Sequence, residues 1–419
     1  MRIRRTLSPT AAPLGFADLW RGLKGFFVGE RYLRRLKEEI TGYFGVRHAW
    51  FTSSGKAALY VILRALRSLR PDRTEVLIPA YTCFSVPSAI VRAGLEVALC
   101  DVDSSSFDFD GALLGKSINE KTLCVVPSHL FGIPSSMESI MGICRERAVF
   151  VLEDAAQAMG VRRGGKMLGT IGDVGFFSLG RGKPVTCGSG GIIVTNSDAI
   201  GRAVDRELSS LPLPGKARQA REYVKVAVMN LFIRPRLYSL PASLPFLHLG
   251  RTVFDTRFPV MRFSPMQAGL CATWRRRLET AASVRREQAG MLWRALDSAR
   301  IAGDPLSAGY LRLPFMTESR ERGQMICSTA RERGLGITRM YPSPINEIPQ
   351  IAHRFAGMAF PSARLVADRL VTLPLHRYVR DGDRDEMARL LRPARRVVTE
   401  DRALGVDMAV PGVAGRERV

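Results

Sequence analysis

Helical patterns alternate with short apolar runs along residues 33–196, and this alternation is the strongest constraint on the fold. The apolar runs are rich in β-branched residues and end in small or polar ones. Because parallel strands joined by crossover helices have this order, we predict an α/β domain built on a mostly parallel sheet. The expected strands are 76–80, 97–102, 123–127, 149–152, 174–179 and 191–195, and the first clear helix pattern is 56–68.

The chain has 419 residues, which is long enough for two or three domains. We expect an N-terminal arm (1–30), a large α/β domain (31–259), a connecting helix with a smaller α+β domain (260–398) and a tail (399–419). Residues 205–259 break the alternation and form an atypical apolar and basic insertion. In the smaller domain we predict a helix from about 266, a strand at 310–314 and helices at 320–333, 361–369 and 383–391.

The charge balance is strongly basic, with 62 Lys and Arg against 39 Asp and Glu and a formal net charge of +23. This balance suits an anionic partner such as nucleic acid, a membrane surface or a phosphorylated metabolite. The arginines are scattered and do not form a basic tract with interleaved aromatic residues. We therefore do not expect a nucleic-acid partner.

Two charge-free runs, 226–233 and 237–250, lie inside the insertion, and Pro241 and Pro245 interrupt the second. Both runs are too short or too broken to span a bilayer. Because lysines and arginines flank them, the stretch 226–250 could lie on an anionic membrane surface. A subunit interface or a lid over the functional site is the interpretation that we favour.

The seven cysteines include no CxxC pair, and several lie in apolar runs, which indicates reduced thiols. We expect a cytoplasmic protein, with the inner face of the membrane as the alternative location. The five histidines lack the spacing of metal ligands, so no metal site is expected. The N-terminal residues are basic but lack the apolar core of a signal peptide.

The most informative motif is EDAAQAMG, residues 153–160, which follows a strand-like run. It places Asp154 and Gln157 at the carboxyl end of that strand, where ligands bind in open α/β sheets. A carboxylate buried there needs a cationic partner, because an unpaired charge out of water is strongly unfavourable. The protonated ring nitrogen of a bound cofactor would supply this partner.

The second motif is FFSLGRGKPVTCGSGG, residues 176–191, which sets Lys183 among five glycines. Ser178 lies five residues before the lysine. Glycines let the backbone approach a ligand closely, and a lysine in a pocket of low exposure becomes a nucleophilic amine. Lys183 is therefore our candidate for a Schiff base with a cofactor. Taken alone, the segment would favour a surface lysine in a glycine-rich turn.

The third motif is TSSGKAAL, residues 52–59, which puts Ser54, Gly55 and Lys56 at the first turn of a predicted helix. Free backbone N–H groups, the helix dipole, a hydroxyl group and a lysine charge together form a phosphate site. A plain N-cap by Ser53 or Ser54 explains the same residues equally well.

Taken together and in order, the motifs between Tyr32 and Leu391 resemble the sugar aminotransferases of the DegT/StrS group. The most specific part of the match is EDAAQ followed by FS and then a lysine. This resemblance implies the aspartate-aminotransferase fold, with a mostly parallel seven-stranded type of sheet flanked by helices, and pyridoxal 5'-phosphate as the cofactor. Further matching segments are IPAYTCFSVPSAIVRAG (78–94), HLFG (129–132), GSGGIIVTN (188–196) and GITRMYPSP (336–344).

The resemblance also implies roles for single residues. Lys183 would form the Schiff base and transfer the proton, and Asp154 would keep the pyridinium nitrogen protonated. Gln157 would hydrogen-bond the ring hydroxyl of the cofactor. Ser178 and the Ser54–Gly55–Lys56 turn would together hold the phosphate of the cofactor.

Some positions depart from the family pattern. The usual threonine beside the phosphate is Lys56 here, and the aromatic residue that stacks on the cofactor ring is Cys83. The segment 260–265 lacks the Asn and the Glu that the family has there. Arg339 and Tyr341 match a stretch near the active-site mouth in the family and would contact the substrate.

These features predict an aminotransferase that moves an amino group from glutamate, or a similar donor, to a keto group of a nucleotide-linked sugar, in amino-sugar or surface-polysaccharide biosynthesis. By resemblance we also expect a homodimer. Two alternatives stay open. One is a cofactor-binding or regulatory homologue without transferase activity, and the other is a sugar dehydratase of the same fold, a branch that has a histidine where Lys183 stands.

Overall fold

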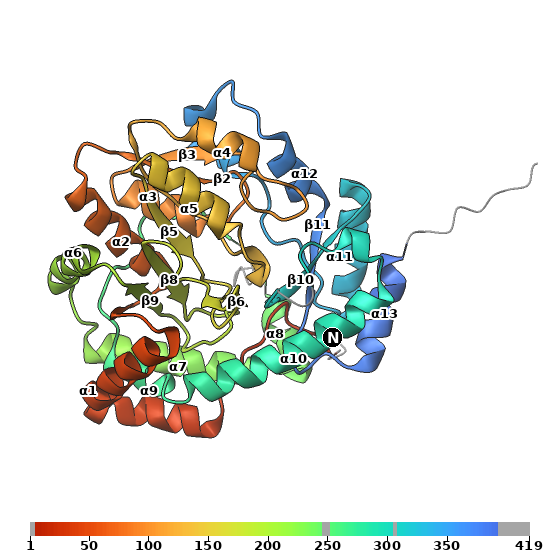
Figure 1. Ribbon diagram of the computed structural model, residues 1–419. Coiled ribbons are helices and arrows are strands. Elements are labelled where there is room, and N and C mark those ends of the chain that lie inside the picture. Colours follow the sequence, from red (N-terminus) through yellow and green to blue (C-terminus); the bar gives the residue numbers. More distant parts are fainter. Residues whose placement is uncertain (1–4, 245–251, 305–307, 393–419) are drawn as a thin grey trace, which may run out of the picture.

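The computed structural model describes residues 5–244, 252–304 and 308–392. Its centre is a seven-stranded sheet with the order β1-β9-β8-β5-β4-β2-β3 (Figure 1). The five strands from β8 to β3 run parallel, whereas β9 is antiparallel to both of its neighbours. The predicted α/β class and the mostly parallel sheet are therefore confirmed. The strands are β1 (His48–Thr52), β2 (Glu75–Pro79), β3 (Glu96–Cys100), β4 (Thr122–Val125), β5 (Phe150–Asp154), β8 (Val174–Ser178) and β9 (Gly191–Thr195).

Helices cover both faces of this sheet, because successive side chains of a strand point to opposite faces. In β2, Val76 and Ile78 pack into the core formed with α2 (Gly55–Leu69), α3 (Ser85–Arg92) and α6 (Asp198–Ser209). Leu77 points the other way, toward α4 (Gly111–Ser117) and α5 (Met137–Glu146). Burial on both faces explains why these strands read as nearly continuous apolar runs.

The C-terminal part is a smaller α+β unit around two antiparallel strands, β10 (Arg312–Met316) and β11 (Leu370–Pro374). Its helices α11 (Arg320–Arg333) and α12 (Pro361–Arg369) have the predicted bounds. The helix predicted from residue 266 is instead two helices, because the chain turns at residues 271–273. They are α9 (Pro265–Leu270) and α10 (Trp274–Ala295), and the last helix is α13 (Asp381–Leu391).

Helix α1 (Phe16–Phe44) was not predicted, since residues up to 30 were assigned to an arm. Its glycines lower helix propensity, but they also let the helix pack directly on α9. A Cβ atom on Gly29 would lie 2.0 Å from Cβ of Pro265, and one on Gly25 would lie 2.6 Å from the carbonyl oxygen of the same proline. Strands β1 and β11 and the hairpin β6 (Arg162–Arg163) and β7 (Lys166–Met167) were also missed.

Within the insertion, the structure has α7 (Lys216–Phe232) and α8 (Pro235–Ala242), while residues 245–251 lie outside the described ranges. The predicted tail, 399–419, also lies outside them. The boundaries that we drew between the arm, the two domains and the tail stay predictions.

Candidate active site

A pocket of about 190 Å³ lies where the parallel strands end. Asp154 is the last residue of β5 and Ser178 the last of β8, and Ser54 directly precedes α2. Because the carboxyl ends of parallel strands meet at one edge of a sheet, residues far apart in the sequence converge there. All eight residues predicted to bind the cofactor or to act on it line this one pocket: Ser54, Gly55, Lys56, Cys83, Asp154, Gln157, Ser178 and Lys183.

Asp154 carries a buried carboxyl group, and among the described residues one backbone N–H donates a hydrogen bond to it. Asp154 is 9% exposed, and its Oδ1 accepts a hydrogen bond from the Ala156 N–H at 3.0 Å. Burial raises the pKa of Asp154, while the positive charge of Lys183 and the Ala156 N–H oppose the shift. The charged form of Asp154 would therefore be stabilised by a cation placed against it.

The raised pKa of Asp154 predicts how stability depends on pH. Above the ordinary Asp pKa of about 3.9, the unfolded chain loses this proton more easily than the folded chain does. The free energy of unfolding therefore falls as pH rises toward the folded-state pKa. Asp154→Asn removes the group, so we expect the cofactor-free variant to be about 1–2 kcal/mol more stable than the wild type at pH 8, and the difference to vanish near pH 3.

Urea unfolding of both cofactor-free proteins between pH 3 and pH 8 measures this difference. Asp72→Asn, a change on an exposed turn, is the matched control and should leave the unfolding midpoint unchanged at each pH. A destabilised Asp154→Asn protein at pH 8 would contradict the prediction.

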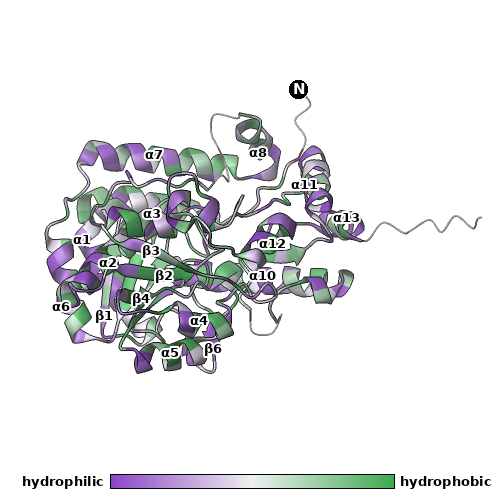
Figure 2. Ribbon diagram, turned by 90° about the horizontal axis from the view of Figure 1, so that it is seen from above, coloured by the Kyte–Doolittle hydropathy of each residue, from purple (hydrophilic) through white to green (hydrophobic). Residues whose placement is uncertain are grey.

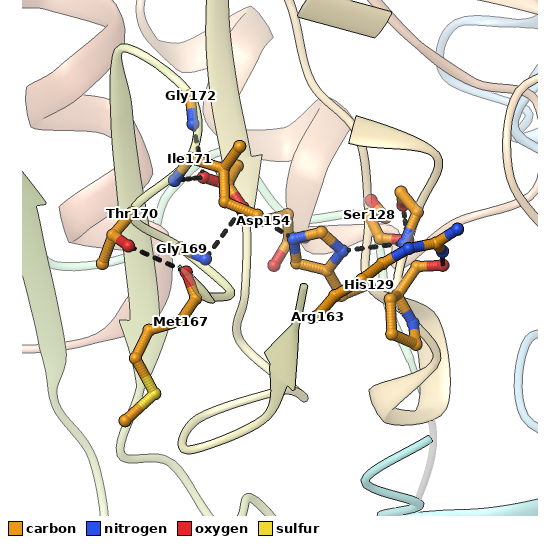
Figure 3. Close-up of polar contacts among 12 residues, drawn as sticks. Ser128, His129, Asp154, Arg163, Met167, Gly169, Thr170, Ile171 and Gly172 are labelled. Carbon is orange, nitrogen blue, oxygen red and sulfur yellow. Dashed lines mark hydrogen bonds and ion pairs between the residues drawn. The ribbon is translucent and has the colours of Figure 1, made fainter. Parts of the chain in front are cut away.

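A buried hydrogen bond between His129 and Glu153 lies beside the pocket (Figure 3). His129 Nε2 lies 2.9 Å from Glu153 Oε2, and neither side chain is exposed. The Ser135 N–H donates to His129 Nδ1 at 3.1 Å, so Nε2 carries the proton that is donated to Glu153. Both ring nitrogens are thus engaged within the protein, and His129 is one of the residues that line the pocket.

Glu153 also ties the chain after β7 to the sheet. Its two oxygens accept hydrogen bonds from the backbone N–H groups of Gly169 at 2.8 Å, Ile171 at 2.5 Å and Gly172 at 2.6 Å. With the bond to His129, one carboxylate joins the loop at 169–172 to a residue that lines the pocket. Glu153 and His129 belong to the motifs EDAAQAMG and HLFG, but the sequence alone predicted no role for either residue.

Gln157 is fixed by two contacts. Its Nε2 donates to the hydroxyl of Tyr341 at 3.1 Å, and its Oε1 accepts from the Phe131 N–H at 3.3 Å. Burial raises the pKa of Tyr341 well above its ordinary value, so the hydroxyl stays protonated. Tyr341 is 1% exposed and lies behind Gln157.

Arg339, predicted with Tyr341 to contact the substrate, is directed elsewhere. Its guanidinium donates to the carbonyl of Ala367, and its Nε lacks a hydrogen-bond partner among the described residues. Neither Arg339 nor Tyr341 is among the residues that line the pocket.

The N-terminus of α2 faces the pocket beside Ser178. Ser54 Oγ accepts from the Ala57 N–H at 3.1 Å, so the N-cap that we held open is present. A Cβ atom on Gly55 would lie 2.9 Å from Cβ of Ser178, which means that only glycine allows this approach. The first-turn N–H groups of a helix lack intrahelical partners, and they favour an anion.

Lys56 lines the pocket but its ammonium group has other partners. Nζ lies 3.6 Å from Asp255 Oδ2 and 4.6 Å from the ring centre of Phe258. Both partners come from the insertion, nearly 200 residues later. Arg92 packs on the same Phe258 ring at 4.6 Å and donates to the carbonyl of Thr256 at 2.8 Å.

Lys183 is half-buried in a turn that its own N–H closes on the carbonyl of Gly180 at 3.3 Å. The neighbouring Gly182 has a φ of +72°, which side-chain-bearing residues rarely adopt. A Cβ atom there would also lie 2.4 Å from Oγ1 of Thr10, so the N-terminal segment packs directly on this turn.

The fold is that of a known class of α/β enzymes. It matches Helicobacter pylori PseC, an aminotransferase involved in the biosynthesis of pseudoaminic acid, with a TM-score of 0.73 and 17% identity over 92% of this chain and 98% of PseC. At this identity the match shows the fold alone. Residues 23–392 match the DegT/DnrJ/EryC1/StrS aminotransferase family, and the chain belongs to this family.

The relatives of this chain include both a named enzyme and a named regulatory protein. The chain is 32% identical over 170 residues to the GDP-perosamine synthase of Vibrio cholerae, which covers 41% of this chain and 46% of that protein. It is 33% identical over 176 residues to the pleiotropic regulatory protein of Geobacillus stearothermophilus, covering 42% and 46%. The matched part is thus less than half the length of these relatives.

Proposed function

We propose that the protein is a pyridoxal-phosphate-dependent aminotransferase, and the observation that carries this proposal is that Lys183 and the buried Asp154 line the same pocket. The cofactor pairs a cationic ring nitrogen with an anionic phosphate. Asp154 is a buried carboxyl group whose charged form a cation would stabilise. The α2 N-terminus, with Ser54 and Ser178, offers donors for an anion. The residues present therefore fit the group.

Each lining residue has a proposed task toward the cofactor. Asp154 would hold the ring nitrogen in its protonated form, and Gln157 would donate its second Nε2 hydrogen to the ring hydroxyl. Cys83 would pack against the ring. Ser178 and the Ser54–Gly55–Lys56 turn would hold the phosphate. When bound, pyridoxal phosphate supplies an electron sink for the carbon that loses its proton.

Lys183 does the proton chemistry in this proposal. Its amine would hold the bound cofactor covalently, and, once released by the donor amine, it would move the proton at the substrate carbon. Tyr341 acts as a positioning residue, because its hydroxyl holds the amide of Gln157 in place. The prediction that Arg339 contacts the substrate is untested.

For the acceptor we propose a keto group on a nucleotide-linked sugar. Two of the matched proteins, the GDP-perosamine synthase and PseC, have names that refer to sugar biosynthesis. The net charge of +23 supports an anionic substrate such as a nucleoside diphosphate sugar. Glutamate is the proposed donor. A homodimer and a cytoplasmic location stay predictions.

The test has two steps that use the full-length protein. Reconstituted with pyridoxal phosphate and given glutamate, it should release one equivalent of 2-oxoglutarate per active site and lose its visible absorbance band. A panel of nucleotide-linked keto-sugars should then restore the band and yield an amino-sugar detectable by mass spectrometry. If no amino donor changes the band of the loaded protein, the aminotransferase proposal fails.

The regulatory alternative has one observation in its favour. Lys56 stands where the family has a threonine, and its ammonium group is 3.6 Å from Asp255. The phosphate end of the pocket is therefore altered. A protein that binds the cofactor but releases no 2-oxoglutarate would favour this alternative. The dehydratase alternative has less support, because that branch has a histidine at the position that Lys183 occupies here.

A further inference from the structure

Helix α1 exposes a row of large apolar side chains. Phe16, Trp20, Leu23 and Phe27 follow one another at intervals of four, three and four residues, which places them on one face of the helix. Phe16 is 84% exposed and Phe27 is 86% exposed. The glycines that pack against α9 lie on the opposite face, so this row points away from the core.

Helix α7 repeats the pattern. Val224, Val228 and Leu231 are spaced four and three residues apart, and they are 58%, 46% and 47% exposed. The buried residues of α7, Gln219 and Val226, lie on its other side. Figure 2 shows α7 along the edge of the molecule, with apolar and polar residues alternating along the helix.

The two helices lie side by side and antiparallel. Leu14, just before α1, exchanges hydrogen bonds with Asn230 near the end of α7. Further along α1, the Tyr223 hydroxyl donates to the carbonyl of Leu19 at 2.9 Å, and its ring lies 6.1 Å from that of Phe26. Residue numbers thus rise along α1 as they fall along α7, and the two exposed rows form one outer face.

The charges on this outer face are mostly positive. Between Phe16 and Val28, the charged residues are Asp18, which is buried, and the two cations Arg21 and Lys24. Lys24 Nζ lies 5.3 Å from the ring centre of Trp20. Along α7, four cations accompany the single carboxylate of Glu222: Lys216, Arg218, Arg221 and Lys225.

We propose that the outer face of α1 and α7, defined by Phe16, Trp20, Leu23, Phe27, Val224, Val228 and Leu231, docks on an anionic lipid bilayer. Aromatic side chains would enter the boundary between headgroups and acyl chains, while the neighbouring lysines and arginines contact the headgroups. This mode needs no spanning segment, and no helix among the described residues is long and apolar enough to cross a membrane. The proposal is independent of the chemistry in the pocket.

A bilayer fits this face better than a second copy of the chain does. In a symmetric dimer each face would meet its own copy, so the cations of one subunit would approach those of the other. The sequence left a membrane surface open for the run 226–250 but favoured a subunit interface or a lid, and of this run Val228 and Leu231 belong to the face. Val226 is buried, and residues 245–250 lie outside the described ranges.

The experiment is flotation of the full-length protein with vesicles of phosphatidylcholine alone or with added phosphatidylglycerol. We expect at least about tenfold tighter binding to the anionic vesicles, and weaker binding as salt increases. Phe16→Ser with Phe27→Ser should lower binding about tenfold, because both side chains lose their apolar contact with lipid. Lys24→Ser with Arg221→Ser should remove most of the preference for anionic vesicles.

The matched control is Met358→Ser, which changes a 51% exposed apolar residue outside this face and should leave binding unchanged. Because Phe16 and Phe27 are exposed, the double variant should keep the unfolding midpoint of the wild type. The proposal is overturned if the wild type does not float with anionic vesicles or if the Phe variant floats equally well. It is also overturned if a wild-type dimer becomes monomeric on Phe16→Ser with Phe27→Ser, since a second copy would then occupy the face.

Discussion

Replacing Lys183 by alanine is expected to lower the rate of amino transfer from glutamate by about 10³-fold or more, because the change removes both the nucleophilic amine and the group that moves the proton. The variant should still fold, since Lys183 is half-buried in a turn that its backbone closes on Gly180. It should also still bind pyridoxal phosphate through the other lining residues, but without the absorbance band of the covalent link.

Single-turnover release of 2-oxoglutarate, followed together with the absorbance spectrum, measures this effect. Lys166→Ala, on the exposed hairpin strand β7, is the matched control and should keep the rate of the wild type. An added alkylamine such as methylamine should restore part of the proton transfer in Lys183→Ala, as expected of a missing amine and not of a distorted fold. Retention of the wild-type rate by Lys183→Ala would remove the basis of the proposed function.

The residues of the pocket could be predicted because each belongs to a local pattern that also sets its position. Asp154 and Gln157 follow an apolar run, and Ser54 begins a helix. In a parallel sheet such positions meet at one edge, so a correct sheet brings them together. The strand assignments and the direction of the chain therefore locate the pocket, whereas Cys83 was predicted only from the family resemblance.

Interactions between distant segments could not be predicted in this way. Nothing in the local sequence around Lys56 indicates that its ammonium group would contact Asp255 and Phe258. Glu153 has the pattern of any residue in a buried strand, and its partners come from a loop 16 to 19 residues later and from His129.

Helix α1 was missed for a different reason. Glycine is unfavourable in an isolated helix, and Gly22, Gly25 and Gly29 occur within 14 residues of its start. Their value lies in tertiary packing, since each faces Pro265 to Leu270 at distances that a Cβ atom would not allow. Tertiary packing here outweighs propensity, and no property of α1 alone could reveal it.

Removal of the Glu153 carboxylate is expected to lower the stability of the protein strongly, because it accepts four buried hydrogen bonds. Glu153→Ala would leave three backbone N–H groups and the His129 Nε2–H without their buried acceptor. An unsatisfied buried donor costs about 1–3 kcal/mol, and partial relaxation lets water reach some of these groups, so we expect a loss of about 3–5 kcal/mol in the free energy of unfolding. Glu153→Gln should lower the free energy of unfolding by less, because the amide oxygen still accepts hydrogen bonds. It should not equal the wild type, because the amide NH₂ group faces N–H donors that it cannot satisfy.

Urea unfolding of the cofactor-free protein measures this loss, with Glu146→Ala as the control because its side chain is 78% exposed and should change stability by less than about 0.5 kcal/mol. The two variants separate the roles of Glu153 and Asp154, which are adjacent in the sequence. Glu153→Ala should destabilise the folded chain, whereas Asp154→Asn should stabilise it in the absence of cofactor. If Glu153→Ala costs less than about 1 kcal/mol, Glu153 does not organise the loop at 169–172, and this loop must be held by other contacts.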